Sequence, residues 1–206
     1  MVRIASRQRP GPAKPLSYEA FLEWLDEDVR AEWVGGRIEL ASPASLPHQR
    51  AVAFLFNLVR RYASIRSLGE AVVAPFQVKL GQRLSGREPD VLFVATEHLG
   101  RMRSTWLEGP PDLAVEVVSP DSISRDWEIK YAEYEASGVR EYWVIDPDRR
   151  RAAFFVRTAE GTFRTVLSGA DGRFASTVLP GLWVDVEWLW CDPLPDEVAL
   201  VQVMLG

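Results

Sequence analysis

The chain has 206 residues, of which 47% are hydrophobic and 26% charged, a composition typical of a globular domain with a sizeable core. The single cysteine, Cys191, excludes an intramolecular disulfide and a cysteine-based zinc cluster, and two histidines exclude a histidine-rich metal site. The formal net charge of -5 argues against a general affinity of the whole surface for nucleic acid. A metal site in this chain would therefore be built mainly from carboxylate oxygens, which favour Mg²⁺ or Mn²⁺.

The amino-terminal segment carries positive charge but no apolar run follows it, which argues against a secretory signal. No uninterrupted apolar stretch is long enough to cross a bilayer, so we expect a cytoplasmic protein. Residues 1–15 contain three prolines and four basic residues and are expected to form a flexible arm. Residues 16–206 are expected to form a single domain.

The first part of the chain predicts two helices separated by a hairpin. Ser17 can cap a helix over residues 18–25. Residues 31–40, AEWVGGRIEL, are typical of a β-hairpin, because the Gly-Gly pair supplies the positive φ angles of a tight turn. A break at residues 42–45 precedes a long amphipathic helix, whose apolar residues recur at helical spacing: Val52, Leu55, Val59 and Tyr62.

Strand signals dominate the rest of the chain. The expected strands are AVVAPFQVKL (71–80), DVLFVA (90–95), DLAVEVVS (112–119), REYWVID (140–146), AAFFVRT (152–158), TFRTVL (162–167), ASTVL (175–179) and LWVDVEWL (182–189). A helix is expected over residues 122–138, ending at Gly138, and a closing helix over residues 195–205.

This order of elements predicts an α/β (α+β) fold, in which helices pack on the faces of a central mixed sheet and additional β-hairpins are attached. The step from residues 112–119 through the helix to residues 140–146 has the length of a strand-helix-strand crossover. We therefore expect these two strands to be parallel neighbours.

Glu116 is the least expected residue in its strand. Side chains alternate along a strand, so Glu116 shares one face with Ala114 and Val118. Burying a lone carboxylate costs on the order of several kcal/mol, unless the carboxylate is paired or binds a cation. The alternative is a solvated or arginine-paired carboxylate at a sheet end. Because Asp90 and Lys130 lie in elements expected to adjoin Glu116, a functional role is favoured.

Lys130 lies on the helix that follows this strand, at the edge of an aromatic face formed by Trp127, Tyr131 and Tyr134. Its simplest alternative role is a surface i,i+4 pair with Asp126. Carboxylates on neighbouring strands with one lysine nearby are what metal-assisted cleavage of a phosphodiester needs. Lys130 is therefore a candidate catalytic residue.

Four further residues are weaker candidates. Asp112 could reach a metal or could simply begin a strand. Glu32 and Glu39, on the two strands of the predicted hairpin, could each supply a further carboxylate. His48 lies at the start of the long helix, where a local contact is the simpler explanation. Asp90, Glu116 and Lys130 rank first, Glu32 and Asp112 next, and His48 last.

The chain resembles the Uma-type family of restriction endonucleases, a branch of the PD-(D/E)XK nuclease-like superfamily. The similarity covers about residues 17–190. The segments that carry it are AEWVGGRIEL, SPASLPHQR, EPDVLFV, PDLAVEVVSP, the D-x-x-x-K-x-x-x-Y run from Asp126 to Tyr134, and GVREYWVIDP. Singly these segments are weak signals, but their order and spacing are fairly specific.

The resemblance implies a restriction-endonuclease-like core with a metal site at one end of the sheet. Asp90 matches the first acidic position of the superfamily pattern and Glu116 the second. The lysine expected two residues after Glu116 is replaced by Val118. The resemblance implies that Lys130, on the next helix, takes over the role of that lysine.

These features together predict a Mg²⁺-dependent (or Mn²⁺-dependent) nuclease that hydrolyses phosphodiester bonds in DNA. Asp90 and Glu116 would hold the metal, with Glu32 or Asp112 as a further ligand or water partner. One alternative is a catalytically silent nucleic-acid-binding or regulatory domain. Another is an assembly protein with exposed tryptophans. The apolar, tryptophan-rich segment from Leu182 to Leu205 predicts a homodimer.

Overall fold

The structure, a computed structural model, describes residues 15–25, 29–40, 44–81, 85–119, 122–123 and 125–206. The predicted flexible arm, residues 1–15, lies outside this part of the chain except for Pro15. Among the helices of the described segments, none is both long and apolar enough to cross a membrane.

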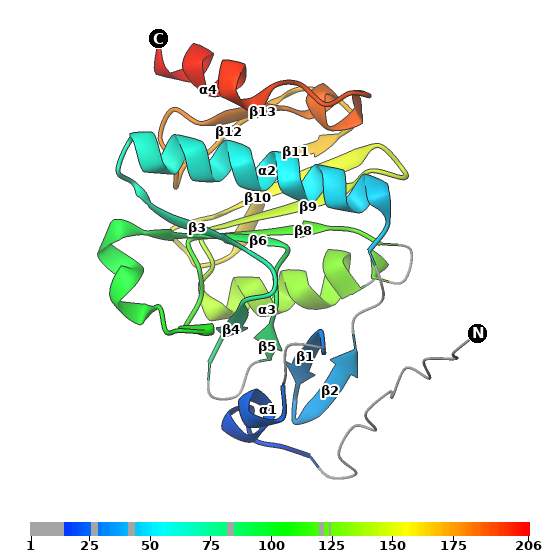
Figure 1. Ribbon diagram of the computed structural model, residues 1–206, viewed down its shortest axis with the longest axis vertical. Helices are drawn as coiled ribbons and strands as arrows, with labels where there is room; N and C mark the ends of the chain where they lie inside the picture. The colour runs from blue at the N-terminus through cyan, green and yellow to red at the C-terminus, as the bar shows by residue number, and fades with distance from the viewer. Residues whose placement is uncertain (1–14, 26–28, 41–43, 82–84, 120–121, 124) are drawn as a thin grey trace, which may run out of the picture.

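A six-stranded mixed sheet forms the centre of the molecule, with strand order β11-β10-β9-β8-β6-β3 (Figure 1). Its strands are β3 (Gly69–Val73), β6 (Val91–Ala95), β8 (Leu113–Val117), β9 (Glu141–Asp146), β10 (Arg151–Arg157) and β11 (Phe163–Gly169). Strands β8 and β9 are parallel and the other neighbours are antiparallel. The predicted mixed sheet is therefore confirmed.

Helices cover the two faces of this sheet (Figure 1). One face packs against α2 (Leu46–Ile65), which buries Leu55, Leu58 and Val59 completely and carries α4 (Glu197–Leu205) on its outer side. The opposite face packs against α3 (Lys130–Ser137), which follows a π-helical turn, η2 (Arg125–Ile129). Two apolar layers thus enclose the central strands, as the α/β prediction requires.

The crossover from β8 through α3 to the parallel strand β9 is also confirmed. Helix α3 ends at Gly138, whose φ of 98° is the left-handed conformation that glycine adopts readily at a helix C-terminus. Because β8 and β9 are parallel, their carboxyl ends meet at the same edge of the sheet. Val118 and Pro147, which follow the last residues of β8 and β9, therefore lie at the same edge of the sheet.

A smaller five-stranded sheet, ordered β2-β1-β5-β4-β7, lies beyond α3 (Figure 1). It consists of β1 (Ala31–Val34), β2 (Arg37–Leu40), β4 (Gln77–Lys79), β5 (Gly86–Arg87) and β7 (Trp106–Glu108), with α1 (Tyr18–Trp24) packed beside it. The Gly35-Gly36 turn joins β1 to β2 with positive φ at both glycines, so the predicted hairpin is confirmed.

The predicted strand over residues 71–80 is instead two strands in different sheets. Pro75 lies between β3 and β4, and proline cannot donate a hydrogen bond to a continuing ladder. Strand β3 is an edge strand of the large sheet, and β4 belongs to the small sheet. This stretch of chain is a link between the two sheets.

The carboxyl-terminal third contains β12 (Arg173–Ala175), β13 (Trp183–Asp185) and a 3₁₀ helix, η3 (Val186–Trp190). Another 3₁₀ helix, η1 (Thr96–Arg101), lies earlier in the chain, directly after β6. The predicted strand over residues 175–179 is wrong beyond Ala175. Buried Glu141 accepts hydrogen bonds from the backbone N–H groups of Thr177 and Val178, which draws this segment into a turn. The strand predicted over residues 182–189 gives way to η3 after Asp185.

Candidate active site

Two neighbouring strands of the large sheet bring Asp90 and Glu116 together. The antiparallel register of β6 and β8 pairs Val91 with Val115, so continuing it by one residue places Asp90 opposite Glu116. Asp90 Oδ2 accepts a hydrogen bond of 2.8 Å from the Val117 N–H, which fixes its carboxylate at the end of β8. The two acidic positions of the predicted site therefore adjoin.

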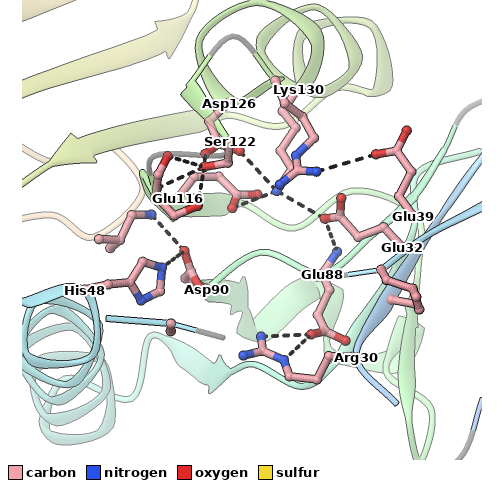
Figure 2. Close-up of a pocket in the computed structure, with 16 residues that line it drawn as sticks. Arg30, Glu32, Glu39, His48, Glu88, Asp90, Glu116, Ser122, Asp126 and Lys130 are labelled. Atoms are coloured by element: carbon pink, nitrogen blue, oxygen red, sulfur yellow. Dashed lines mark hydrogen bonds and ion pairs between the residues drawn. The ribbon is translucent and has the colours of Figure 1, made fainter. Parts of the chain in front are cut away.

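Lys130, the first residue of α3, points toward Glu116 from the helix that covers this face of the large sheet (Figure 2). Its Nζ lies 2.9 Å from Glu116 Oε2, 3.1 Å from Glu32 Oε1 and 3.4 Å from Asp126 Oδ1. The side chain of Lys130 is only 5% exposed. The structure thus places the ammonium of Lys130, on α3, against the carboxylate of Glu116, on β8.

Glu32 reaches this cluster from β1 of the small sheet. Its Oε1 also accepts the Glu88 N–H at 3.2 Å, and its Oε2 lies 2.9 Å from Arg87 Nη1. Arg87 is itself buried and also pairs with Glu133 on α3, at 2.6 Å. The site therefore lies between the two sheets, and Arg87 joins the small sheet to α3 behind it.

Sequence reasoning missed three side chains that hold the site. Asp126, expected on the surface, is buried beside Lys130, and Ser122 donates a hydrogen bond to its Oδ2. The Tyr134 hydroxyl donates to Glu116 Oε1 at 2.7 Å. The spacing of D-x-x-x-K-x-x-x-Y was the available signal, since residues four apart share a helix face.

Burial governs the pKa of Glu116. Desolvation raises the pKa of its carboxyl well above the ordinary range, the neighbouring carboxylates of Asp126, Asp90 and Glu32 raise it further, and Lys130 opposes this shift. Desolvation also raises the pKa of Asp126, again opposed by Lys130. Negative charge at these positions is therefore unfavourable without a nearby cation.

The pKa values of Lys130 and Glu32 both shift in the direction that favours the charged form of the side chain. Burial alone would lower the pKa of Lys130, but the carboxylates of Glu116, Glu32 and Asp126 outweigh it and raise this pKa above its ordinary value. Burial would raise the pKa of Glu32, but Lys130 and Arg87 lower it to about 2. Lys130 and Glu32 are consequently both charged at neutral pH.

His48, in the first turn of α2, lies on the other side of Asp90 (Figure 2). Its Nε2 is 3.3 Å from Asp90 Oδ2, and its Nδ1 is buried without a hydrogen bond to any described residue. The predicted local contact at the helix start is thus a contact with the candidate site. Its ring limits the directions from which a ligand can approach Asp90.

Asp112 lies elsewhere. It precedes β8, about 13 Å from Glu116 at the usual rise of a strand. Its carboxylate accepts the Ala95 N–H at 2.8 Å and pairs with His98 and with Arg140. This placement corrects the expectation that Asp112 reaches a metal held by Asp90 and Glu116, because its oxygens are engaged at the opposite end of the strand.

The clustered side chains line a cavity of about 250 Å³ between the two sheets. Glu39, from the second strand of the hairpin, also lines it and lies 3.7 Å from Arg125 on the opposite wall. Arg30 lines it as well and binds Glu88 at 3.0 Å. The cavity therefore has a carboxylate-rich wall and two arginines among its lining residues.

The chemistry of these donors suits a hard divalent cation. Mg²⁺ is commonly held by one or two carboxylates and completes its coordination with water and phosphate oxygens. Asp90 and Glu116 could supply these two carboxylates, and the raised pKa of Glu116 reflects negative charge that a cation would offset. Within the described segments, no three His, Cys, Asp or Glu side chains are arranged to hold a metal ion by themselves. The residues thus fit a cation with two protein ligands.

A mixed sheet flanked by helices, with Asp90, Glu116 and Lys130 gathered at one sheet edge, defines a restriction-endonuclease-like fold. A family model, Uma2, described as "Putative restriction endonuclease", matches residues 18–187. The chain belongs to this family. No curated protein matches the chain significantly.

A solved structure shows the same architecture. It is described as "a putative nuclease belonging to DUF820" from Anabaena variabilis, and it is 15% identical to this chain. The superposition covers 85% of this chain and 98% of that one, with a TM-score of 0.70. At this identity the similarity shows a shared fold.

Proposed function

We propose that this protein is a metal-dependent nuclease that hydrolyses phosphodiester bonds in DNA. The observation that carries the proposal is the buried ammonium of Lys130, which lies within 3.4 Å of three carboxylates in a cavity that Asp90 also lines, at the edge of a restriction-endonuclease-like sheet. A hydrophobic side chain would fill this space at lower cost. Membership of the Uma2 family supports the same activity.

In this proposal Asp90 and Glu116 hold Mg²⁺ or Mn²⁺. When bound, the ion polarises the scissile phosphate and lowers the pKa of a bound water. Tyr134 orients the Glu116 carboxylate through its hydrogen bond. The Val117 N–H does the same for Asp90. Both ligands are therefore held in place before substrate arrives.

Lys130 orients the attacking water and stabilises the negative charge that develops on the phosphate. Glu32, which is ionised at neutral pH, holds the ammonium on the side away from Glu116 and keeps it charged. The nucleophile in this proposal is water, so no covalent intermediate with the protein is expected.

Cleavage of a supercoiled plasmid in the presence of Mg²⁺ or Mn²⁺ tests the proposal. Wild type should nick the plasmid, whereas Asp90→Ala and Glu116→Ala should not. Asp112→Asn is the matched control, because it neutralises a buried carboxylate at the far end of the same strand and should leave cleavage intact. Equal nicking by wild type and Glu116→Ala would refute the proposal. Failure of wild type with both ions would favour a catalytically silent nucleic-acid-binding domain.

A further inference from the structure

A second cavity, of about 450 Å³, lies beside the candidate active site. Three segments that are far apart in the sequence form its walls: the first turns of α2, the turn after β9 and the chain around the end of η3. Arg50, Arg150, Trp190 and Asp192 are the charged and large aromatic residues that line it.

The position of this cavity follows from the topology. Parallel pairing of Val117 with Ile145 means that the turn carrying Arg150 leaves the sheet at the same edge as the chain after Glu116. Helix α2 separates the two cavities, since His48 lines the first while Arg50 lines the second. An α-helix with its side chains is about 10 Å across, so the cavities flank one helix turn at about that spacing.

The charge of the second cavity differs from that of the whole chain. It carries two guanidinium groups and one carboxylate, in a protein with a net charge of -5. Arg50 Nη1 is 3.6 Å from Asp192 Oδ1, but the two side chains are 57% and 86% exposed, so this pair is weak. Arg150 is exposed and forms no ion pair within the described part of the chain. Both arginines are available to an anionic ligand.

Trp190 supplies an aromatic wall with a fixed orientation. Its Nε1 donates a hydrogen bond of 2.6 Å to the carbonyl oxygen of Ala170, and its ring is partly exposed. Arginines beside a fixed aromatic ring suit the backbone and bases of a nucleic-acid strand, where phosphates bind the cations and bases or sugars pack on the ring.

We propose that this cavity binds the DNA backbone that flanks the scissile bond, with Arg50 and Arg150 contacting phosphates. The inference rests on the proposed nuclease function. A spacing of about 10 Å corresponds to about three phosphates at the 3.4 Å axial repeat of one DNA strand. A strand with one phosphate at Glu116 and Lys130 thus reaches the second cavity a few nucleotides away.

The test is the affinity for a short fluorescent DNA duplex, measured by anisotropy in EDTA so that no cleavage occurs. Wild type is compared with the double variant Arg50→Ala/Arg150→Ala. The matched control is Arg66→Ala/Arg164→Ala, which removes the same charge from exposed positions at the opposite sheet edge. All are titrated over a series of salt concentrations, and inorganic phosphate is added as a competitor.

The Arg50→Ala/Arg150→Ala variant should bind the duplex more weakly, and its slope of log affinity against log salt should be smaller by about 1.8, or about 0.9 for each phosphate that the variant no longer neutralises. The control should keep the wild-type slope. Equal losses in both double variants would overturn the inference, because net charge alone would then explain them. Displacement of the duplex by millimolar phosphate would show a free-anion site and would also overturn it.

The failure of this inference can be distinguished from failure of the proposed function. If wild type and the Arg50→Ala/Arg150→Ala variant bind duplex equally while wild type still nicks plasmid, only the second cavity is excluded. If wild type neither binds duplex at any salt concentration nor nicks plasmid with Mg²⁺ or Mn²⁺, the proposed function fails as well. Because the substituted arginines are exposed, circular dichroism should show that the Tm of the double variant is unchanged. If its Tm does fall, the single variant Arg150→Ala is used instead, and it should show about half the change in the slope of log affinity against log salt.

Discussion

Replacing Lys130 with methionine tests how strongly its ammonium stabilises the buried carboxylates. The substitution keeps most of the side-chain volume but removes the charge that lies within 3.4 Å of Glu116, Glu32 and Asp126. Removing one partner of a buried ion pair costs about 3–5 kcal/mol, because the remaining charge loses its counter-charge. For a chain of this length that corresponds to a fall in Tm on the order of 6–20 °C.

The loss should also depend on pH. Lys130 lowers the pKa of Glu116, so removing it raises further a pKa that burial already holds above the unfolded value of about 4.3. A carboxyl with a raised pKa in the folded state binds more protons there than in the unfolded chain, so stability falls as pH rises through the folded pKa.

Urea unfolding followed by circular dichroism at about pH 5 and about pH 8 measures this effect. Lys130→Met should be closer to wild type in free energy of unfolding at the lower pH, where Glu116 and Asp126 take up protons. An equal loss at the two pH values, or no loss at either, would refute the reasoning.

Three further predictions concern other parts of the molecule. Glu116→Gln should fold, and its stability should depend less on pH than that of wild type, because the raised pKa of Glu116 shows that its ionised carboxylate is unfavourable. Calorimetry should show that this variant no longer binds Mn²⁺, and retained binding would contradict the assignment of Glu116 as a ligand. Glu141→Gln should lower the free energy of unfolding by about 1–3 kcal/mol in urea titrations, because an amide NH₂ would face N–H and O–H donors; unchanged stability would contradict this. Sedimentation should show a homodimer, as the apolar segment from Leu182 to Leu205 predicts; a monomer at tens of micromolar would count against it.

The elements that the sequence predicts well are those with local signals. The hairpin has a Gly-Gly turn, α2 has apolar residues at helical spacing, and the crossover ends at a glycine with positive φ. Alternation along β8 correctly indicated a buried Glu116 between Ala114 and Val118. These patterns depend on neighbours in the sequence, so they are visible without the fold.

Long-range contacts set the features that the sequence did not predict. The turn after Ala175 forms because Glu141, more than thirty residues away, binds its backbone. Asp126 is buried because the helix that carries it packs between the two sheets, and Arg87 is buried because Glu32 and Glu133 surround it. Nothing local distinguishes Arg87 from a surface charge, and the only local signal for Asp126 is its spacing of four residues from Lys130.

Asp112 illustrates the converse case. Its place after Pro110-Pro111 and before an acidic strand made it similar in sequence to Asp90, which also follows a proline. The two strands run antiparallel, so residues at their starts lie at opposite edges of the sheet. The direction of the two strands, rather than the residue type, places Asp90 at the candidate site and Asp112 at the opposite edge, where it pairs with Arg140.

The most direct test of whether Lys130 replaces the lysine missing at Val118 is the rate of DNA cleavage by Lys130→Met. The rate is measured under single-turnover conditions, at a temperature where circular dichroism shows that the variant is folded. Loss of its charge should lower the rate about 10² to 10³-fold, by analogy with removal of one oxyanion donor, while Mn²⁺ affinity by calorimetry stays close to wild type. Cleavage at the wild-type rate by the folded variant would contradict the assignment of Lys130 as a catalytic residue.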